Sequence, residues 1–473
     1  MSRLVIVSNR IADLHSTTQS GGLAVALADA MRKRGGMWMG WSGKTVRALP
    51  DDASPHVEDI GKVRVLALPL PEQEFDDYYS GYANSVLWPL FHYRLDLIHY
   101  NPAFPEAYHA INRRFARALA PHLREDDLVW VQDYHLIPVG HYLRQLGCRQ
   151  RLGFFLHIPF PPADLLEASP EHAELVETLL AYDVAGFQTR ADVNNMHDYL
   201  HHRMGLVPDA NGFVESAGRR TFIGNFPIGI DVDAFRKLAA DTPGDVAFDQ
   251  IRHQVLNRKQ IIGIDRLDYS KGLPQRVQAI DRLLQQHPEM EGRFSLLQIS
   301  PPTRCGVKAY DQIRTELERL TGAVNGRWSD FNWTPIRYIH RTVPRDRLAS
   351  MIRVSDVGFV TPLRDGMNLV AKEFVAAQDP DDPGVLVLSR FAGAAEDLTA
   401  AVIVNPYDLD DMARKLHDAL VMPLDERRER HEALIEAVRE TDIASWFDAF
   451  LARLEAPSAH SQTEARLAQV ANA

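Results

Sequence analysis

Three segments combine cations with glycines in places where they could bind anionic phosphate groups. The first, Ser8–Asn9–Arg10, follows the apolar run Leu4–Val7 and precedes Gly21–Gly22. Glycines at the start of a helix let backbone N–H groups approach a ligand, and the helix N-terminus favours phosphate. An ordinary strand-to-helix turn explains this spacing equally well, because it matches neither GxGxxG nor a Walker motif. Arg10 favours binding, since open α/β sheets bind ligands at the carboxyl ends of their strands.

The second segment, Asp265–Gly272, also follows an apolar run and precedes a helical pattern. Arg266 and Lys271 are therefore expected to face one crevice. Two cations there can neutralise the charge that develops on a departing diphosphate. The alternative is a surface ion network that pairs Arg266 with Asp265 or Asp268. The position at a strand's carboxyl end favours a functional role.

The third segment, Thr361–Glu373, follows the apolar run Val357–Val360. Gly366 frees the backbone, and Asn368 is placed to cap a helix whose first N–H groups would point toward a diphosphate. Glu373 lies about one turn further along, where its carboxylate could accept two hydrogen bonds from ribose hydroxyls. A capped helix with an exposed glutamate is the alternative for this segment alone.

Aromatic residues cluster near Tyr79 and Trp88, and further polar side chains follow in Asp133 and His157. Such rings can stack on sugar faces while the polar groups bond hydroxyls, although core packing explains many of them equally well. Two DxD pairs, at Asp231 and Asp408, resemble a metal-binding motif of sugar-nucleotide enzymes. Each precedes an apparent helix, so helix capping is the predicted role.

Short apolar runs without alternation predict strands that are buried on both faces. They lie at Leu4–Val7, Leu128–Val131, Leu152–Ile158, Val184–Phe187, Ile261–Ile264, Phe294–Ile299, Val357–Val360, Val385–Leu388 and Val402–Val404. Helix-period segments separate them, as at Leu23–Met31 and Val277–Leu284. This alternation predicts an α/β protein with parallel sheets and crossover helices.

The strands form two groups, which we interpret as two Rossmann-like domains. We expect residues 1–240 to form the first and 241–440 the second, with the linker at Ala240–Asp245, where a Pro-Gly pair occurs. An apolar helical stripe from Ile443 to Leu454 predicts a helix at 441–456 that packs back across the domains. A loose tail is expected at 457–473.

The composition of the chain excludes several classes of protein. The 473 residues carry a net charge of −11, which argues against a nucleic-acid partner. The two cysteines, Cys148 and Cys305, are too few for a disulfide framework and lack zinc-site spacing. No apolar stretch is long enough for a signal peptide or a membrane span. We therefore expect a cytoplasmic protein without membrane contact.

A longer series of motifs carries a family resemblance. In order, the sequence contains SNRIA, SGGLAVAL, YYSGYANSVLWPLFHYR, WVQDYHLIPV, GFFLHIPFP, GFQT, PIGID, DRLDYSKGLPQR, RDGMNLVAKEFVAAQ and VLVLSRFAGAA. From about Ser2 to Leu454 the chain resembles the trehalose-phosphate synthases, which are retaining glucosyltransferases. The resemblance implies the GT-B architecture, with two Rossmann-like domains facing a deep interdomain cleft.

The resemblance also implies an activity. The family transfers glucose from UDP-glucose to glucose 6-phosphate, giving α,α-trehalose 6-phosphate and UDP, by a front-face mechanism without cofactor or metal. We also expect a homo-oligomer, either a dimer or a tetramer. Three alternatives stay open: another phosphorylated acceptor such as glycerol 3-phosphate, GDP-glucose as donor, and a non-catalytic sugar-phosphate sensor.

The resemblance further assigns roles to residues. The implied donor-binding residues are Gly21, Gly22, Arg266, Lys271, Val343, Asp365, Gly366, Met367, Asn368, Leu369 and Glu373. The implied acceptor-binding residues are Arg10, Tyr79, Trp88, Asp133 and Arg304. Arg266, Lys271, Asp133, His157 and Asp365 are the implied catalytic residues, and Trp88 and Ile158 the implied determinants of the anomer. Two departures, Gln132 before DYH and Cys305 after Arg304, remove no functional group.

Overall fold

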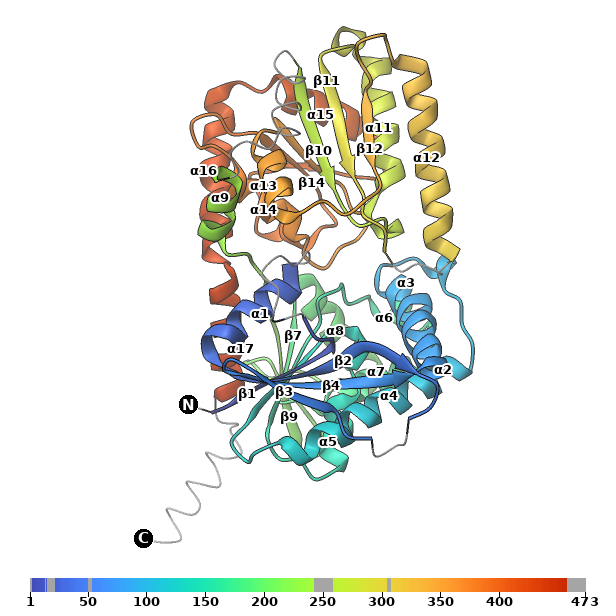
Figure 1. Cartoon of the computed structure of the whole chain (residues 1–473), viewed down its shortest axis with the longest axis vertical. Coiled ribbons are helices and arrows are strands. Elements are labelled where there is room, and N and C mark those ends of the chain that lie inside the picture. Colours follow the sequence, from blue (N-terminus) through green and yellow to red (C-terminus); the bar gives the residue numbers. More distant parts are fainter. Residues whose placement is uncertain are drawn as a thin grey trace. The chain divides into compact units, whose positions relative to one another are not determined.

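The structure is a computed structural model that describes residues 2–12, 14, 22–49, 53–241, 258–303 and 308–456. It divides into two compact units (Figure 1). Within the described ranges, the first unit comprises residues 2–12, 14, 23–226 and 446–456. The second comprises Gly22 and residues 227–241, 258–303 and 308–445.

The first unit contains a nine-stranded sheet in the order β3-β4-β2-β1-β5-β6-β7-β9-β8. The strands are β1 (Leu4–Arg10), β2 (Gly36–Val46), β3 (His56–Ile60), β4 (Val63–Pro71), β5 (Leu128–Gln132), β6 (Arg151–Phe155), β7 (Val184–Phe187), β8 (Phe213–Ser216) and β9 (Arg219–Asn225). All neighbours pair in parallel except the two edge pairs, β3 with β4 and β8 with β9. The carboxyl ends of the parallel strands therefore share one edge.

The second unit contains a six-stranded sheet in the order β12-β11-β10-β13-β14-β15. Its strands are β10 (Lys259–Ile264), β11 (Phe294–Ile299), β12 (Ile336–Ile339), β13 (Val357–Val360), β14 (Val385–Ser389) and β15 (Val402–Val404), and all pair in parallel. β10 and β13 are neighbours at the centre, where the strand order reverses, and such a switch point is where open α/β sheets bind ligands.

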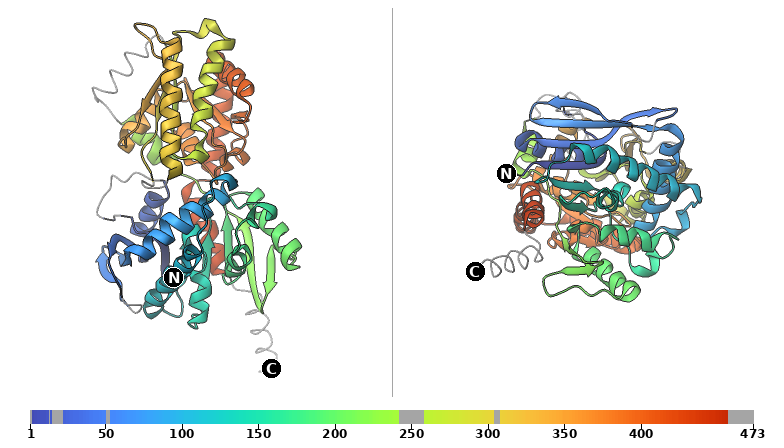
Figure 2. Two further views of the ribbon diagram at one scale, coloured as in Figure 1. Left: turned by 90° about the vertical axis from the view of Figure 1, so that its right-hand side faces the viewer. Right: turned by 90° about the horizontal axis from the view of Figure 1, so that it is seen from below.

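Helices provide the crossovers. In the first unit they are α1 (Gly22–Arg34), α2 (Glu72–Phe75), the π-helix η1 (Asp76–Leu87), α3 (Trp88–Phe91), α4 (Ala103–Leu119), α5 (Val139–Gln145), α6 (Ala163–Leu166), α7 (His172–Leu179) and α8 (Arg190–Met204). In the second they are α9 (Val232–Ala240), α11 (Leu273–Gln286), α12 (Lys308–Trp328), α13 (Arg345–Arg353), α14 (Leu369–Ala377), α15 (Leu409–Val421) and α16 (Leu424–Glu440). α11 and α12 lie side by side (Figures 1 and 2).

The prediction of an α/β protein with two parallel sheets is confirmed, and each of the nine apolar runs contains a strand. No predicted run covers β2, β4, β9, β12 or the two antiparallel edge strands, β3 and β8. β2 shows why: after its buried start at Met37–Met39 it continues through polar and partly exposed residues to Val46. Such a strand has no continuous apolar run to recognise.

The division between the units differs from the expected boundary at residue 240. The first unit ends at Phe226, because α9 packs against α13 and α14 of the second. The linker expected at Ala240–Asp245 lies outside the described residues beyond Asp241, as does the expected tail at 457–473.

The last helix, α17 (Ile443–Glu455), buries its apolar stripe on the first unit. The Phe450 ring stacks on Trp130 of β5, with 4.3 Å between centroids and 9° between planes. A Cβ added at Gly153 would lie 2.7 Å from Phe450, and one at Gly186 would lie 2.8 Å away. The glycines of β6 and β7 thus provide the space that this ring needs, and the described contacts of the stripe are with the first sheet.

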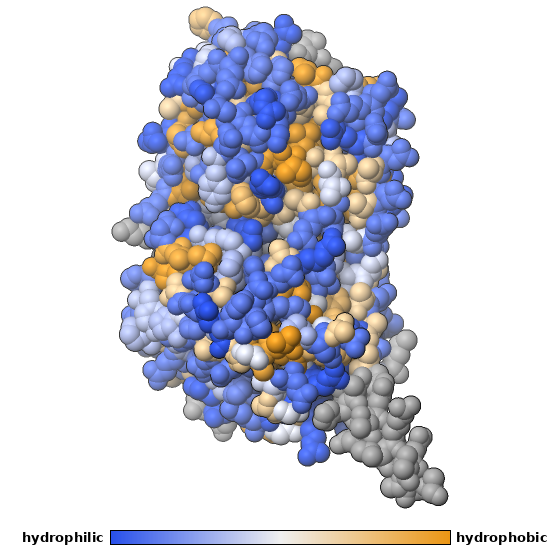
Figure 3. Space-filling model, turned by 180° about the vertical axis from the view of Figure 1, so that it is seen from behind, coloured by the Kyte–Doolittle hydropathy of each residue, from blue (hydrophilic) through white to orange (hydrophobic). Residues whose placement is uncertain are grey.

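Hydrophilic side chains dominate the face of the molecule in Figure 3, with apolar residues in scattered patches. Among the described residues, no helix combines the length and the apolar character needed to cross a bilayer.

Candidate active-site residues

Aromatic rings and Arg10 gather at the carboxyl edge of the first sheet. The guanidinium carbon of Arg10 lies 5.5 Å from the ring centroid of Trp41. Trp41 is followed by Phe75 at 4.5 Å, Tyr79 at 5.1 Å and His135 at 5.7 Å, each distance joining successive ring centroids. Arg10 is exposed and Tyr79 is half-buried. A cation beside a partly accessible aromatic column suits a phosphorylated sugar.

Asp133 follows β5 with a backbone conformation that side chains rarely adopt. Its φ is 74° and its ψ is 164°, a region that is essentially restricted to glycine. The conformation is held from both sides, because the Asp133 amide donates to the Phe155 carbonyl at 2.7 Å and the His157 amide donates to Asp133 Oδ1 at 3.2 Å. Strain of this kind costs about 1–3 kcal/mol and marks sites where a side chain must be aimed.

His157 follows β6 and is held as a neutral ring. Its Nε2 lies 2.9 Å from Gln132 Oε1, and its Nδ1 lies 3.4 Å from Gln188 Nε2. The glutamine oxygen can only accept and the glutamine nitrogen can only donate, so Nε2 carries the proton. Burial lowers the pKa of His157 to about 3. The ring therefore stays uncharged at neutral pH.

Trp88 and Ile158 form apolar walls near this edge. Trp88 is 4% exposed, and its ring lies 4.1 Å from the His92 centroid and 5.7 Å from that of Tyr134. Ile158 is 6% exposed and follows His157 directly.

An ion pair joins two loops at the carboxyl edge of the second sheet. Lys271 Nζ lies 2.6 Å from Asp365 Oδ2, and Asn368 Nδ2 donates to the same oxygen at 3.0 Å. Lys271 ends the turn after β10, whereas Asp365 follows β13. Gly272 permits the approach: its φ is 65°, and an added Cβ would lie 2.1 Å from the Thr361 carbonyl oxygen.

Asn368 caps α14, as predicted from the sequence. Its φ is 81°, and its side-chain oxygen accepts from the Ala371 amide at 3.1 Å. Gly366 and Met367 lead into this cap, and Leu369 begins the helix. The turn thus directs the first N–H groups of α14 toward the edge that also holds Lys271 and Asp365, which creates positive potential there.

Glu373 lies on α14 beside a cation. Its Oε1 is 3.5 Å from Arg345 Nη2, and its side chain is 17% exposed. Burial raises the pKa of Glu373, while the charge of Arg345 opposes the rise. Because the Glu373 side chain is largely buried, the alternative of an exposed glutamate is wrong.

Val343, just before α13, is buried.

A buried ion pair that the sequence reading did not identify supports this edge. Arg276 is completely buried and donates to Asp265 Oδ2 at 2.7 Å, to Gln298 at 2.8 Å and to Thr361 at 3.1 Å. Asp265 thus pairs with Arg276, which the alternative network of Arg266 with Asp265 or Asp268 did not include, and Arg266 itself is exposed. Arg276 lies three residues after Leu273 and four before Ile280, which places it on the apolar face of α11, so its spacing was a local signal of burial although it did not identify the partners.

Lys372 is a second buried cation that was missed. Its Nζ donates to the Ile228 carbonyl and the Thr441 hydroxyl, both at 3.0 Å, and lies 3.7 Å from Asp397 Oδ2. Burial lowers the pKa of Lys372 to about 8. Lys372 of α14 thus contacts Ile228 near the start, and Thr441 near the end, of the segment 227–445 that forms most of the second unit. It is the neighbour of Glu373 in the sequence.

Some predicted residues have no described position. Gly21 and Arg304 lie outside the described residues, and Gly22 is described as the first residue of α1. The two DxD pairs have the predicted capping role, since Asp231 accepts from the Ala234 amide at 2.9 Å and Asp408 from the Asp411 amide at 3.0 Å.

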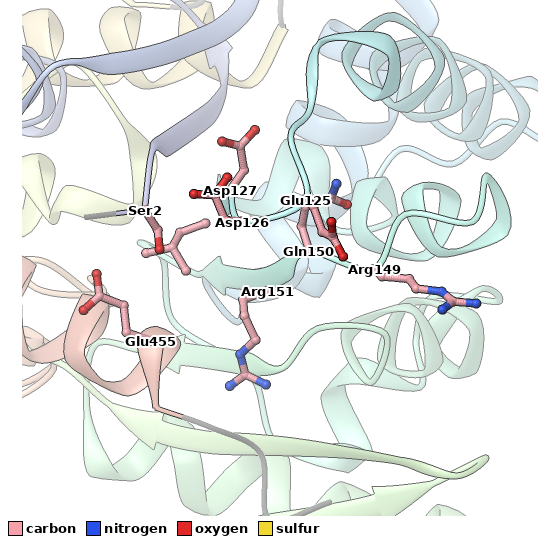
Figure 4. Close-up of a pocket in the computed structure, with 9 residues that line it drawn as sticks. Ser2, Glu125, Asp126, Asp127, Arg149, Gln150, Arg151 and Glu455 are labelled. Atoms are coloured by element: carbon pink, nitrogen blue, oxygen red, sulfur yellow. The ribbon is translucent and has the colours of Figure 1, made fainter. Parts of the chain in front are cut away.

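A cavity of about 420 Å³ lies at the opposite, amino edge of the first sheet (Figure 4). None of the predicted site residues lines it. Three of its six charged residues pair with residues outside the lining: Asp127 with Arg3 at 2.6 Å, Arg151 with Asp183 at 3.0 Å and Glu455 with Arg34 at 3.2 Å. It is therefore a polar surface hollow between salt bridges.

Two parallel-sheet units, each with polar and cationic side chains at a carboxyl edge, define a class of α/β enzymes that act on phosphorylated or nucleotide-linked substrates. The sequence profile of glycosyltransferase family 20 matches residues 3–456, and the chain belongs to this family.

Within this family, the chain is similar to trehalose-phosphate synthases of known sequence and structure. The chain is 45% identical to the trehalose-6-phosphate synthase of Klebsiella pneumoniae, covering 99% of this chain and 98% of that protein. It is similar to an α,α-trehalose-phosphate synthase (UDP-forming) from Burkholderia xenovorans in complex with glucose-6-phosphate, with 46% identity, a TM-score of 0.92 and coverage of 96% and 100%. An E. coli structure bound with UDP-2-fluoro glucose has 42% identity, a TM-score of 0.92 and coverage of 97% and 100%.

The neutral state of His157 predicts a pH dependence of stability. An unfolded histidine takes up a proton near pH 6.5, whereas folded His157 does so only near pH 3. Between these values the unfolded chain binds more protons, so His157 makes the free energy of unfolding fall as the pH falls. We expect the loss of melting temperature from pH 7 to pH 5 to be smaller in His157→Asn than in the unchanged protein.

Thermal unfolding followed by circular dichroism at pH 5, 6 and 7 measures this difference. His202→Asn, which alters an exposed histidine of α8, is the control. If the melting temperatures of His157→Asn and of the unchanged protein ran parallel over this range, His157 would not be held neutral in the fold.

Proposed function

We propose that this chain transfers glucose from UDP-glucose to glucose 6-phosphate and releases α,α-trehalose 6-phosphate and UDP. The observation that carries the proposal is the cluster of Lys271, Asp365 and Asn368 beside the N-terminus of α14. It combines a cation, a helix N-terminus and hydroxyl-binding groups at a switch point, which suits a sugar diphosphate. The relatives that bind glucose-6-phosphate and UDP-2-fluoro glucose support the choice of substrates.

In this proposal the second unit holds the donor. Lys271 and Arg266 neutralise the diphosphate, together with backbone amides of Gly366 to Leu369. Asp365 binds hydroxyls of the glucosyl group, Glu373 binds the ribose and Val343 contacts the uracil. Gly21 and Gly22 belong to the donor loop.

The first unit holds the acceptor. Arg10 and Tyr79 of this unit bind the phosphate of glucose 6-phosphate, Trp88 forms a wall and Asp133 orients the attacking hydroxyl. The resemblance adds Arg304, which is not a residue of this unit, to the phosphate contacts. His157 holds the 6-hydroxyl of the donor sugar, and Ile158 with Trp88 selects the anomer. The strained backbone of Asp133 and the glutamines around His157 fix both side chains before substrate arrives, which limits the reorganisation that the reaction needs.

The reaction proceeds with retention on the front face. The acceptor hydroxyl attacks the anomeric carbon as UDP leaves, and a phosphate oxygen of the leaving group takes the hydroxyl proton. No side chain acts as a nucleophile. A histidine with a pKa of about 3 suits this scheme, because it can bind a hydroxyl without supplying a proton at neutral pH. Alignment and charge stabilisation would each contribute several kcal/mol.

Product analysis tests the proposal. Purified protein is incubated with UDP-glucose and glucose 6-phosphate, with and without a chelator, and the products are identified by mass spectrometry and NMR. We expect an α,α-linked disaccharide phosphate at equal rates in both samples. A product only from glycerol 3-phosphate or only from GDP-glucose would contradict the assigned substrates, and binding without turnover would indicate a sensor.

The role of the two cations predicts the effect of removing them. Arg266→Ala and Lys271→Ala should each lower kcat by about 100-fold or more, the loss that follows removal of one donor to a developing anion. Steady-state kinetics with both substrates measures the loss. Lys259→Ala is the matched control, since Lys259 begins β10 and pairs with Asp356 at 2.7 Å. Turnover within a few-fold of normal in both variants would contradict the leaving-group role.

A further inference from the structure

Two histidines and a glutamate form a cluster at the opposite end of α11 from Lys271. His287 follows the last residue of α11, Glu289 lies in the 3-10 turn Pro288–Met290, and His417 lies on α15, which packs against α11. Each side chain offers one ligand atom, and these atoms lie within 4.8 Å of one another. Within the described ranges no other group of three histidine, cysteine or carboxylate side chains meets this spacing.

The donor atoms have the spacing of a metal site. Glu289 Oε1 lies 3.0 Å from His287 Nδ1 and 3.9 Å from His417 Nε2. A tetrahedral zinc ion with bonds of about 2.0–2.2 Å holds its ligand atoms about 3.4 Å apart. The two imidazole rings stack at 3.8 Å between centroids with 9° between planes. Because the nitrogen lone pairs lie in these nearly parallel planes, one ring must turn out of the stack before both rings can bind one ion. Binding of an ion therefore requires a change of side-chain rotamer at His287 or His417.

A carboxylate behind one ligand adds a second feature of metal sites. His417 Nδ1, the ring nitrogen that does not face Glu289, lies 3.7 Å from Asp418 Oδ1. Metal-binding histidines usually hydrogen-bond their second nitrogen to such a group, but 3.7 Å is too long for that bond, so Asp418 supplies a nearby negative charge rather than a fixed tautomer. Glu289 is 58% exposed, whereas His287 is 27% and His417 21% exposed. An ion can therefore reach Glu289 from solvent, and the partly exposed histidine side chains have room to turn toward it.

We propose that His287, Glu289 and His417 bind Zn²⁺ and so link the C-terminal end of α11 to α15, with water as the fourth ligand. Two imidazole nitrogens and one carboxylate oxygen suit zinc, whereas Mg²⁺ and Ca²⁺ prefer oxygen ligands alone. The site stabilises the second unit and takes no part in glucosyl transfer. It is thus independent of the proposed reaction. The same contacts without an ion, as a plain hydrogen-bonded cluster, are the alternative that the test must separate.

Calorimetric titration with Zn²⁺ tests the site directly. The full chain without a histidine tag is stripped with a chelator, transferred to chelator-free buffer and titrated. We expect one Zn²⁺ per chain and a higher melting temperature with Zn²⁺, because an ion that binds the folded state stabilises it. Co²⁺ used in place of Zn²⁺ should give the visible absorption of a tetrahedral ion.

Variants identify the ligands. His417→Ala, His287→Ala and Glu289→Gln should each weaken Zn²⁺ binding at least about tenfold, the loss that follows even when a group behind the ligands is removed. Each should also abolish the rise in melting temperature. Glu289→Gln keeps the shape of an exposed side chain, so its folding without Zn²⁺, checked by circular dichroism, should match that of the unchanged protein.

The matched control is the double variant His201→Ala/His202→Ala on α8, which removes two exposed neighbouring rings whose centroids lie 4.7 Å apart. It should leave Zn²⁺ affinity unchanged. The proposal is overturned if no saturable binding of one Zn²⁺ occurs, if Glu289→Gln and His417→Ala bind as tightly as the unchanged protein, or if the control loses affinity equally.

Discussion

The partly buried ion pair between Lys271 and Asp365 joins the two loops at the second sheet's carboxyl edge. The turns after β10 and β13 meet there, and a backbone hydrogen bond of 2.7 Å from the Leu363 amide to the Ser270 carbonyl runs beside the pair. A buried charge without a partner is strongly unfavourable, so each side chain fixes the place of the other. The ammonium group of Lys271 has three donors, so a diphosphate at this edge can share it with Asp365.

At the carboxyl edge of the first sheet, side chains are positioned by a neutral histidine and by a strained backbone instead of by an ion pair. His157 is neutral because it is buried between glutamines, and Asp133 is aimed by a backbone conformation that the neighbouring strand holds. This difference matches the two proposed ligands. A sugar diphosphate needs compensating positive charge, whereas an attacking hydroxyl needs orientation more than charge.

The sequence allowed the fold to be predicted where local physics decides the structure. Apolar runs marked the central strands, and Asn368, Asp231 and Asp408 marked helix starts, because a cap needs only residues close in sequence. It failed for β2, whose second half is polar. It also failed for the buried cations Arg276 and Lys372. Their burial depends on partners up to 144 residues away, such as Ile228 for Lys372, and no local pattern records these partners.

The candidate site shows the same difference between what local sequence predicts and what depends on contacts distant in sequence. Each implied residue near a strand end could be placed on its edge from the order of the elements alone. The contacts that make these residues effective, such as Gln132 with His157 and Asn368 with Asp365, required the structure. His287 and His417, 130 residues apart in the printed sequence, meet only because α11 and α15 pack together.

The claim that Lys271 is held by Asp365 in order to bind a diphosphate is tested most directly by calorimetric binding of UDP. The comparison needs the unchanged protein, Lys271→Met, Asp365→Asn and the double variant. Because a charge-assisted hydrogen bond contributes about 1.5–3 kcal/mol, Lys271→Met should weaken UDP binding at least about tenfold. If Asp365 acts on UDP through Lys271, the double variant should bind UDP no more weakly than Lys271→Met. Unchanged affinity in Lys271→Met, or two losses that simply add, would contradict this account.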